Sequence, residues 1–226
     1  MKNKFRFIGL FILALIVSYI PLLKLPFMWT QTFFHEISHG LIAIISGGNI
    51  ERIEIHALGS GIIFTIGGSR FLTLLSGYAG AALWGSLLVL TVVHAGHRRA
   101  HFIAGFLSLF VLLSAVLWAR DLITLAILIS ISALCLLAYR YGASKPVEYF
   151  MQFMGAYVIL DALKSPLYLI DGRSFGDGAS LSRLTQIPEI IWIGLWEAFA
   201  VLCVWLLWRA LTDDGDPQIA GRHKKF

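Results

Sequence analysis

Residues 33–48 read FFHEISHGLIAIISGG, an apolar run that contains three ionisable side chains, His35, Glu36 and His39. An ionisable group inside an apolar segment is costly to bury in lipid and is by default a functional-site hypothesis. Residues four apart on an α-helix lie on one face, so His35 and His39 should project together. This stretch therefore predicts a helix that carries a polar site through apolar surroundings.

The composition around this stretch is that of an integral membrane protein. Of the 226 residues, 58% are hydrophobic and 14% are charged, and the mean hydropathy is +0.79. Soluble domains carry roughly 45–50% apolar and about 25% charged residues. Cys135 and Cys203 are too few for a disulfide framework and lack metal-ligand spacing, so we expect both to be small core residues. The net charge of +5 fits membrane-flanking cations, and no nucleic-acid motif is present.

A membrane-spanning helix needs about 20 mostly apolar residues. This criterion predicts an all-α polytopic membrane protein with about six or seven transmembrane helices, the candidates being residues 7–23, 27–46, 71–94, 101–118, 122–139, 147–164 and 188–210. The cations Lys2, Lys4 and Arg6 favour a cytoplasmic N-terminus. The second span would then return the chain to the cytoplasmic side. An odd number of spans would leave the basic C-terminal end outside, against the positive-inside tendency.

Residues 49–68 do not fit a span and predict a membrane-associated β-hairpin. Polar and apolar residues alternate from Arg52 to Ala57 and then break at LGSG, and period two around a glycine turn is typical of a hairpin. An open sheet edge cannot face lipid, so the hairpin should lie at the membrane surface or against protein, on the cytoplasmic side. Residues 165–187 look like a glycine-rich connection. We expect one membrane-embedded domain over 1–210 and a polar tail over 211–226.

The spacing His35-Glu36-x-x-His39 suits a zinc site. Two imidazole nitrogens on one helical face can hold Zn²⁺ at about 2.0–2.1 Å. Glu36, one position after the first histidine, stands where a general base could take a proton from the attacking water. A catalytic zinc site needs a third protein ligand, and a carboxylate is the expected partner of two histidines.

These residues resemble the site-2 protease family of intramembrane zinc metalloproteases, in particular its bacterial branch. The resemblance covers residues 28–85, with the HExxH stretch and the hairpin, and residues 171–200. It implies that His35 and His39 are zinc ligands, that Glu36 is catalytic, and that a later Asp-Gly motif supplies the third ligand.

Three aspartates compete for the third position. Asp171, in LIDG, looks like the family's Leu-Asp-Gly motif, and Asp177, in GDGASLSRLTQIP, resembles the segment that the bacterial branch places before its last span. Asp161 lies in an apolar helix and could face the bundle interior. We prefer Asp177 and leave Asp171 and Asp161 open.

The expected function is hydrolysis of peptide bonds in a membrane-anchored protein or peptide by a multi-pass zinc protease of the cell (inner) membrane. One alternative is a catalytically inactive membrane protein of the same fold that acts as a binding or regulatory partner. Another is a metal transporter that uses His94, His97 and His101, but transporters usually show internal repeats and we find none. The lipid bilayer is the other expected partner, and no nucleic acid is expected.

Overall fold

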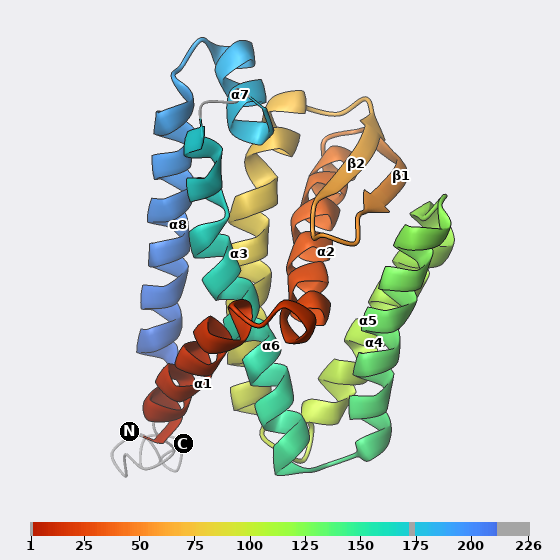
Figure 1. Ribbon diagram of the computed structural model, residues 1–226, viewed down its shortest axis with the longest axis vertical. Helices are drawn as coiled ribbons and strands as arrows, with labels where there is room; N and C mark the ends of the chain where they lie inside the picture. Colours follow the sequence, from red (N-terminus) through yellow and green to blue (C-terminus); the bar gives the residue numbers. More distant parts are fainter. Residues whose placement is uncertain (1, 172–174, 212–226) are drawn as a thin grey trace, which may run out of the picture.

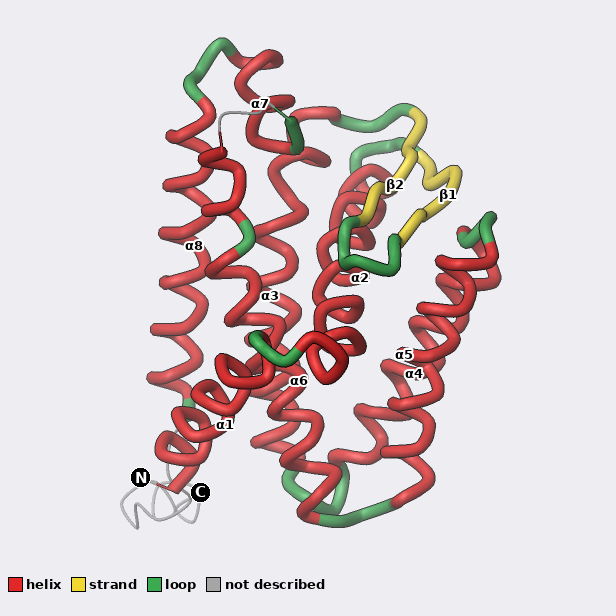
Figure 2. The backbone as a smooth tube through the Cα atoms, viewed as in Figure 1, coloured by secondary structure: helices red, strands yellow, loops and turns green. Residues whose placement is uncertain are grey.

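Helices make up most of the protein, and one two-stranded sheet interrupts them in the part of the chain described here (Figures 1 and 2). The computed structural model describes residues 2–171 and 175–211. Its elements are α1 (Lys2–Ser18), α2 (Pro21–Ile45), β1 (Asn49–Ile55), β2 (Gly61–Ile66), α3 (Arg70–Ala95), α4 (Ala100–Trp118), α5 (Leu122–Tyr141), α6 (Lys145–Lys164), the 3₁₀-helix η1 (Pro166–Asp171), α7 (Asp177–Thr185) and α8 (Glu189–Ala210). The expected all-α polytopic membrane class is confirmed.

The number of candidate spans in the described residues is five or six, because the first two expected spans together count as one at most. Five helices, α3, α4, α5, α6 and α8, are each long and apolar enough to cross a membrane. Helices α1 and α2 meet this criterion only as a pair, and they are bent by 113° at the break between them. The cause is local: α1 has only 17 residues, and α2 restarts at Pro21, a residue favoured in the first turn of a helix.

The bend between α1 and α2 affects where the hairpin lies relative to the N-terminus. The start of α1, the end of α8 and the α3–α4 and α5–α6 connections lie at one end of the molecule, whereas the hairpin and α7 lie toward the other (Figure 1). The structure thus places the hairpin away from the start of α1, whereas the sequence predicted that it returns to the side of the N-terminus. Helix α1 starts and α8 finishes at the same end of the molecule, as an even number of spans requires.

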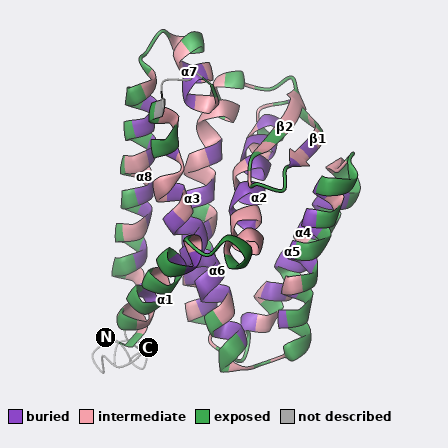
Figure 3. Ribbon diagram, in the orientation of Figure 1, coloured by how far each residue is buried: buried purple, intermediate pink, exposed green. Residues whose placement is uncertain are grey.

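Helix α6 forms the centre of the bundle. Every residue from 151 to 160 is buried, and α6 packs against α1, α2, α3 and α8 (Figure 3). A Cβ added to Gly155 would lie 2.9 Å from the carbonyl oxygen of Gly85, so glycine on both helices lets α3 approach α6 closely. The outer faces of α4, α5 and α8 expose large apolar side chains such as Phe106, Leu137 and Val201. Apolar surfaces both inside and outside are expected of a bundle surrounded by lipid.

The predicted hairpin is confirmed: β1 and β2 pair antiparallel, with Ile53 opposite Ile63. It packs against protein, as expected from the cost of an open edge in lipid. The Trp29 indole N–H donates to the carbonyl of Ala57 at 3.0 Å, and the Thr32 hydroxyl donates to that of Gly59 at 2.6 Å. Both bonds fasten the turn of the hairpin to α2.

The outer edges of the two strands differ. Ile53 forms a bridge with Ala119, and the Ile55 backbone N–H donates to the Thr124 hydroxyl at 2.8 Å, so the α4–α5 region covers the edge of β1. The outer edge of β2 lines a cleft instead.

Residues 165–187 are more ordered than a glycine-rich connection. They contain η1 and α7; Gly176, with φ of 99°, immediately precedes α7, and Gln186, with φ of 62°, follows it. The predicted polar tail lies outside the described residues except for Leu211, which is buried. The boundary of the single domain at residue 210 stays a prediction.

Candidate metal centre

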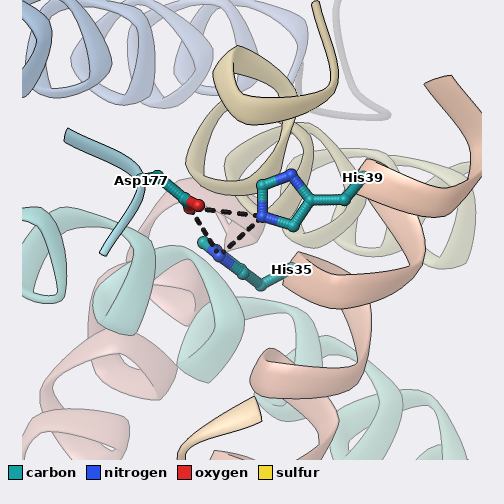
Figure 4. A group of neighbouring side chains, drawn as sticks. All are labelled: His35, His39 and Asp177. Atoms are coloured by element: carbon teal, nitrogen blue, oxygen red, sulfur yellow. Dashed lines mark hydrogen bonds and ion pairs between the residues drawn. The ribbon is translucent and has the colours of Figure 1, made fainter. Parts of the chain in front are cut away.

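Two helices far apart in the sequence bring three candidate ligands together. His35 and His39 project from one side of α2, and Asp177, the first residue of α7, faces them (Figure 4). The two Nε2 atoms lie 3.1 Å apart. Asp177 Oδ2 lies 3.1 Å from Nε2 of His35 and 3.2 Å from Nε2 of His39. The three donor atoms thus form a nearly equilateral triangle.

This triangle has the size that a zinc ion requires. For ligands at about 2.0–2.2 Å in tetrahedral geometry, neighbouring donor atoms should be separated by about 3.3–3.6 Å, so the observed 3.1–3.2 Å is within a few tenths of an ångström. Two histidines and one carboxylate also match the ligand set of catalytic zinc sites, which keep a fourth position open. The residues present therefore fit a zinc ion in both distance and chemistry.

The tautomer of His39 suits a ligand. Its Nδ1 lies against the backbone carbonyl of Thr73 on α3, where only an N–H can form a hydrogen bond. With a metal ion bound, this carbonyl would keep a proton on Nδ1 and leave the Nε2 lone pair free to face the ion. The ring of His35 is held by packing edge-on against Tyr78, with centroids 4.4 Å apart.

Asp177 is poised as an ionised ligand. Burial disfavours its charged form, but the charge of His39 and the hydrogen bonds from both histidines outweigh this effect and lower the pKa of the Asp177 carboxyl below its ordinary value. Its place in the first turn of α7 adds the positive end of the helix dipole. A metal ligand must be deprotonated, and this environment keeps the Asp177 carboxyl ionised.

Glu36 lies beside the triangle without belonging to it. Its side chain is buried, and its carboxylate interacts with the backbone of Ile63 on β2. A Cβ added to Gly61 would lie 2.8 Å from Oε1 of Glu36, so the glycine at the start of β2 makes room for this carboxylate. Glu36 is therefore positioned between the ligands and the open strand.

A cleft of about 730 Å³ joins these parts. Its walls come from α2, β2, α3 and α7, and it contains the three candidate ligands, Glu36 and the edge of β2 around Ile63 and Thr65. An extended chain in this cleft could contact both the strand and the ligand triangle.

The other predicted candidates lie elsewhere. Among the residues that the structure describes, the only group of three candidate ligands is His35, His39 and Asp177. Asp161 accepts a hydrogen bond from the Ser165 hydroxyl at 3.0 Å and is not in this group. Asp171 ends η1, but its side chain lies outside the described part of the structure. His94, His97 and His101 form no ligand group.

Sequence reasoning missed the residues of α3 that shape the site. A Cβ at Gly77 would overlap Nε2 of His39 and lie 2.7 Å from Cε1 of His35. Thr73 and Tyr78, which contact the two imidazoles, lie on the same helix. The small residues Gly77, Ala81 and Gly85, spaced four apart, are the signal that could have indicated close packing here.

Gly77→Ala should weaken zinc binding, because the added methyl displaces the imidazole of His39. Changes to residues that orient metal ligands typically cost about 10–100-fold in affinity, and we expect a loss in this range. Competition with a zinc chelator measures it. Gly194→Ala on α8 is the matched control, since a Cβ there meets nothing within 4 Å. Equal zinc affinity in the two variants would contradict the role of Gly77.

Fold and site together define a polytopic membrane protein in which an HExxH helix and a later aspartate form a candidate metal-ligand set. A family model described as Peptidase M50B-like matches residues 8–207. The chain therefore belongs to the Peptidase M50B-like family, and the resemblance to site-2 proteases is confirmed. No curated protein and no solved structure matched the chain. Family membership supports a membrane metallopeptidase at the level of class.

Proposed function

We propose that this protein is a zinc endopeptidase that hydrolyses peptide bonds of membrane-anchored proteins within or at the edge of the bilayer. One observation carries the proposal: the donor atoms of His35, His39 and Asp177 converge at 3.1–3.2 Å beside Glu36 in one cleft. Membership of the Peptidase M50B-like family supports the coarser class. The substrate and the cell (inner) membrane location are part of the proposal.

His35, His39 and Asp177 would hold the zinc ion. When bound there, zinc supplies a Lewis acid that polarises the scissile carbonyl and makes water more acidic. Glu36 then has two tasks: it takes a proton from the attacking water and returns it to the nitrogen of the leaving amine. Its burial beside the triangle keeps the carboxylate within the cleft, where both transfers take place.

The edge of β2 offers a place for the substrate backbone. In an antiparallel pair, successive residues point their N–H and C=O groups alternately toward the partner and away from it. The backbone N–H of Ile55 points away from β2, toward Thr124. The backbone groups of Ile53, two residues earlier, and of Ile63, which pairs with Ile53, therefore also point outward. The backbone of Ile63 therefore faces the cleft, and an extended peptide could add a strand there.

Ile63→Pro should raise KM, because proline removes the N–H that faces the cleft. The same N–H contacts the Glu36 carboxylate, so kcat is measured together with KM. One hydrogen bond contributes about 0.5–1.5 kcal/mol, so we expect a rise of roughly 2- to 10-fold. Zinc content should not change. Ile63→Ala, which keeps the N–H, should retain the KM of the native protein. A fall in kcat alone would instead indicate disturbance of Glu36, and unchanged kinetics would remove the substrate-binding role of this edge.

An inactive protein that only binds partners is not favoured, because Asp177 completes the ligand set. The decisive experiment compares the native protein with Glu36→Gln on membrane-anchored candidate substrates, with zinc measured in both. Cleavage by the native protein alone, with equal zinc, supports the enzyme. Equal cleavage by both would overturn it.

A further inference from the structure

The side chain of Tyr78 on α3 forms part of the cleft wall beside the ligand triangle. Its ring packs edge-on against His35, with centroids 4.4 Å apart, and against Trp196 of α8, with centroids 4.8 Å apart. Trp196 is buried, and its indole N–H donates to the backbone carbonyl of Leu75 at 2.9 Å. The phenol ring is therefore held between a candidate metal ligand and an anchored tryptophan.

The hydroxyl of Tyr78 has no hydrogen-bond partner among the residues that the structure describes, and it is not sealed off from the cleft. A tyrosine hydroxyl in largely buried surroundings usually finds a partner in the protein. Here packing fixes the ring, while no described protein group satisfies the donor at its tip. The hydroxyl is therefore available to a polar group that enters the cleft.

Tyr78 and Glu36 approach the ligand triangle from different walls of the cleft. Glu36 contacts the backbone of Ile63 on β2, whereas Tyr78 packs against α8. The hairpin and α8 lie on opposite sides of α2 and α3 (Figure 1). Of the charged side chains, Asp177 and then Glu36 have the largest electrostatic effect on the Tyr78 phenol, which places its hydroxyl near the triangle. A carbonyl group at the triangle would meet Glu36 from one side and Tyr78 from the other.

Several other side-chain donors line the cleft, but they are less suited to this position. The Thr73 hydroxyl is closed off from solvent, and the Ser180 hydroxyl accepts a hydrogen bond from Arg183 at 3.1 Å. Arg70 is exposed at the first residue of α3. Tyr78 combines contact with a ligand imidazole and an accessible, unpartnered hydroxyl.

We infer that Tyr78 is a further catalytic residue, whose hydroxyl donates a hydrogen bond to the oxygen of the scissile carbonyl while water adds to that carbonyl. The inference depends on the proposed protease function. During addition, the water oxygen bonds to the carbonyl carbon, the π electrons of the C=O bond move to the carbonyl oxygen, and Glu36 takes the proton.

Tyr78 keeps its proton throughout this sequence. A phenol, with an ordinary pKa of about 10, is protonated at neutral pH and can act as a donor. When the C–N bond breaks, the electron pair on the oxygen restores the C=O bond, and Glu36 gives the proton to the leaving nitrogen. Tyr78 therefore ends the reaction as it began.

A fixed donor of this kind should act on kcat more than on KM. It stabilises an oxygen that gains charge in the transition state more than the uncharged carbonyl of the bound substrate. Removing one such donor typically lowers kcat by about 10²–10³-fold. At a metal site the donor stabilises only part of the charge, so we expect a fall of about 10- to 100-fold.

Tyr78→Phe tests this role, because it removes the hydroxyl and keeps the ring that packs against His35 and Trp196. The zinc-loaded variants are compared with the native protein on a single-span membrane reporter that the native protein cleaves. We expect kcat to fall by about 10- to 100-fold, KM to stay within about twofold, and zinc content to be unchanged. Tyr157→Phe is the matched control: it removes a hydroxyl from a buried tyrosine of α6 outside the cleft lining and should change none of the three.

Binding of a phosphinic peptide, built on the sequence of the cleaved bond, gives a second readout that requires no turnover. Its two phosphinyl oxygens stand for the charged carbonyl oxygen and the oxygen of the added water. Transition-state analogues gain affinity from interactions that the substrate lacks. Tyr78→Phe should bind this peptide about 10- to 100-fold more weakly than the native protein, whereas Tyr157→Phe should bind it equally well.

The outcomes separate the role of Tyr78 from the protease function. A native kcat in Tyr78→Phe, or an undiminished affinity for the phosphinic peptide, would overturn the catalytic role and leave the protease function intact. Loss of zinc, or a rise in KM alone, would also overturn it, because Tyr78 would then serve the metal site or substrate binding. If the native protein cleaves no reporter, the proposed function fails, and the role of Tyr78 fails with it.

Discussion

Asp177→Ala is expected to lose zinc as severely as His39→Ala, because each substitution leaves only two ligands. Two-ligand sites bind zinc far more weakly than three-ligand sites. We expect a loss greater than the roughly 100-fold upper range for residues that only support ligands. Metal analysis of the purified variants, with a chelator titration for the affinity, provides the measurement. Asp177 lies at the edge of the cleft on α7, so the fold should tolerate the change.

Two further aspartate variants make the experiment specific. Asp161→Asn removes a buried carboxylate that hydrogen-bonds to Ser165 and lies outside the ligand group, so zinc should stay bound. Asp171→Ala should also keep zinc, with at most a modest loss. Zinc lost from Asp171→Ala and retained in Asp177→Ala would mean that the wrong aspartate was preferred.

Glu36→Gln is expected to abolish measurable cleavage while zinc stays stoichiometric. Glutamine has nearly the same shape and can fill the space beside Gly61, but it cannot accept a proton from water. General acid–base catalysis typically contributes about 10²–10⁴-fold, and we expect kcat to fall by at least that factor. Because Glu36 is not one of the three ligands, the zinc content should match that of the native protein.

A matched control separates chemistry from packing. Glu197→Gln makes the same substitution on α8, away from the cleft lining, and should leave both cleavage and zinc unchanged. Loss of zinc in Glu36→Gln would show that the carboxylate holds the metal or its ligands. Residual cleavage within a few-fold of the native rate would remove Glu36 from its role as general base.

Features that depend on local sequence could be predicted. The four-residue spacing of His35 and His39 places both imidazoles on one side of α2, because helical periodicity is a property of the backbone. The hairpin followed from alternation around LGSG, and most spans followed from apolar runs of sufficient length. Membership of the protease family, now confirmed, was likewise indicated by residues adjacent in the chain.

The choice among three aspartates depended on contacts between distant segments. Asp177 lies 142 residues after His35, and no local pattern says that α7 folds back onto α2. Gly77 matters for the same reason: its missing side chain is informative only once α3 is seen against the two imidazoles. A segment of this length could bring its two ends together in many conformations. The packing of the whole bundle selects the one in which Asp177 faces His35.

The number of spans also required the tertiary structure. Hydropathy identified two apolar segments before residue 46, but it could not reveal the 113° bend between α1 and α2, with which they count as one span at most. Hydropathy and charge are properties of single segments, whereas the direction of each span is decided by its packing against its neighbours.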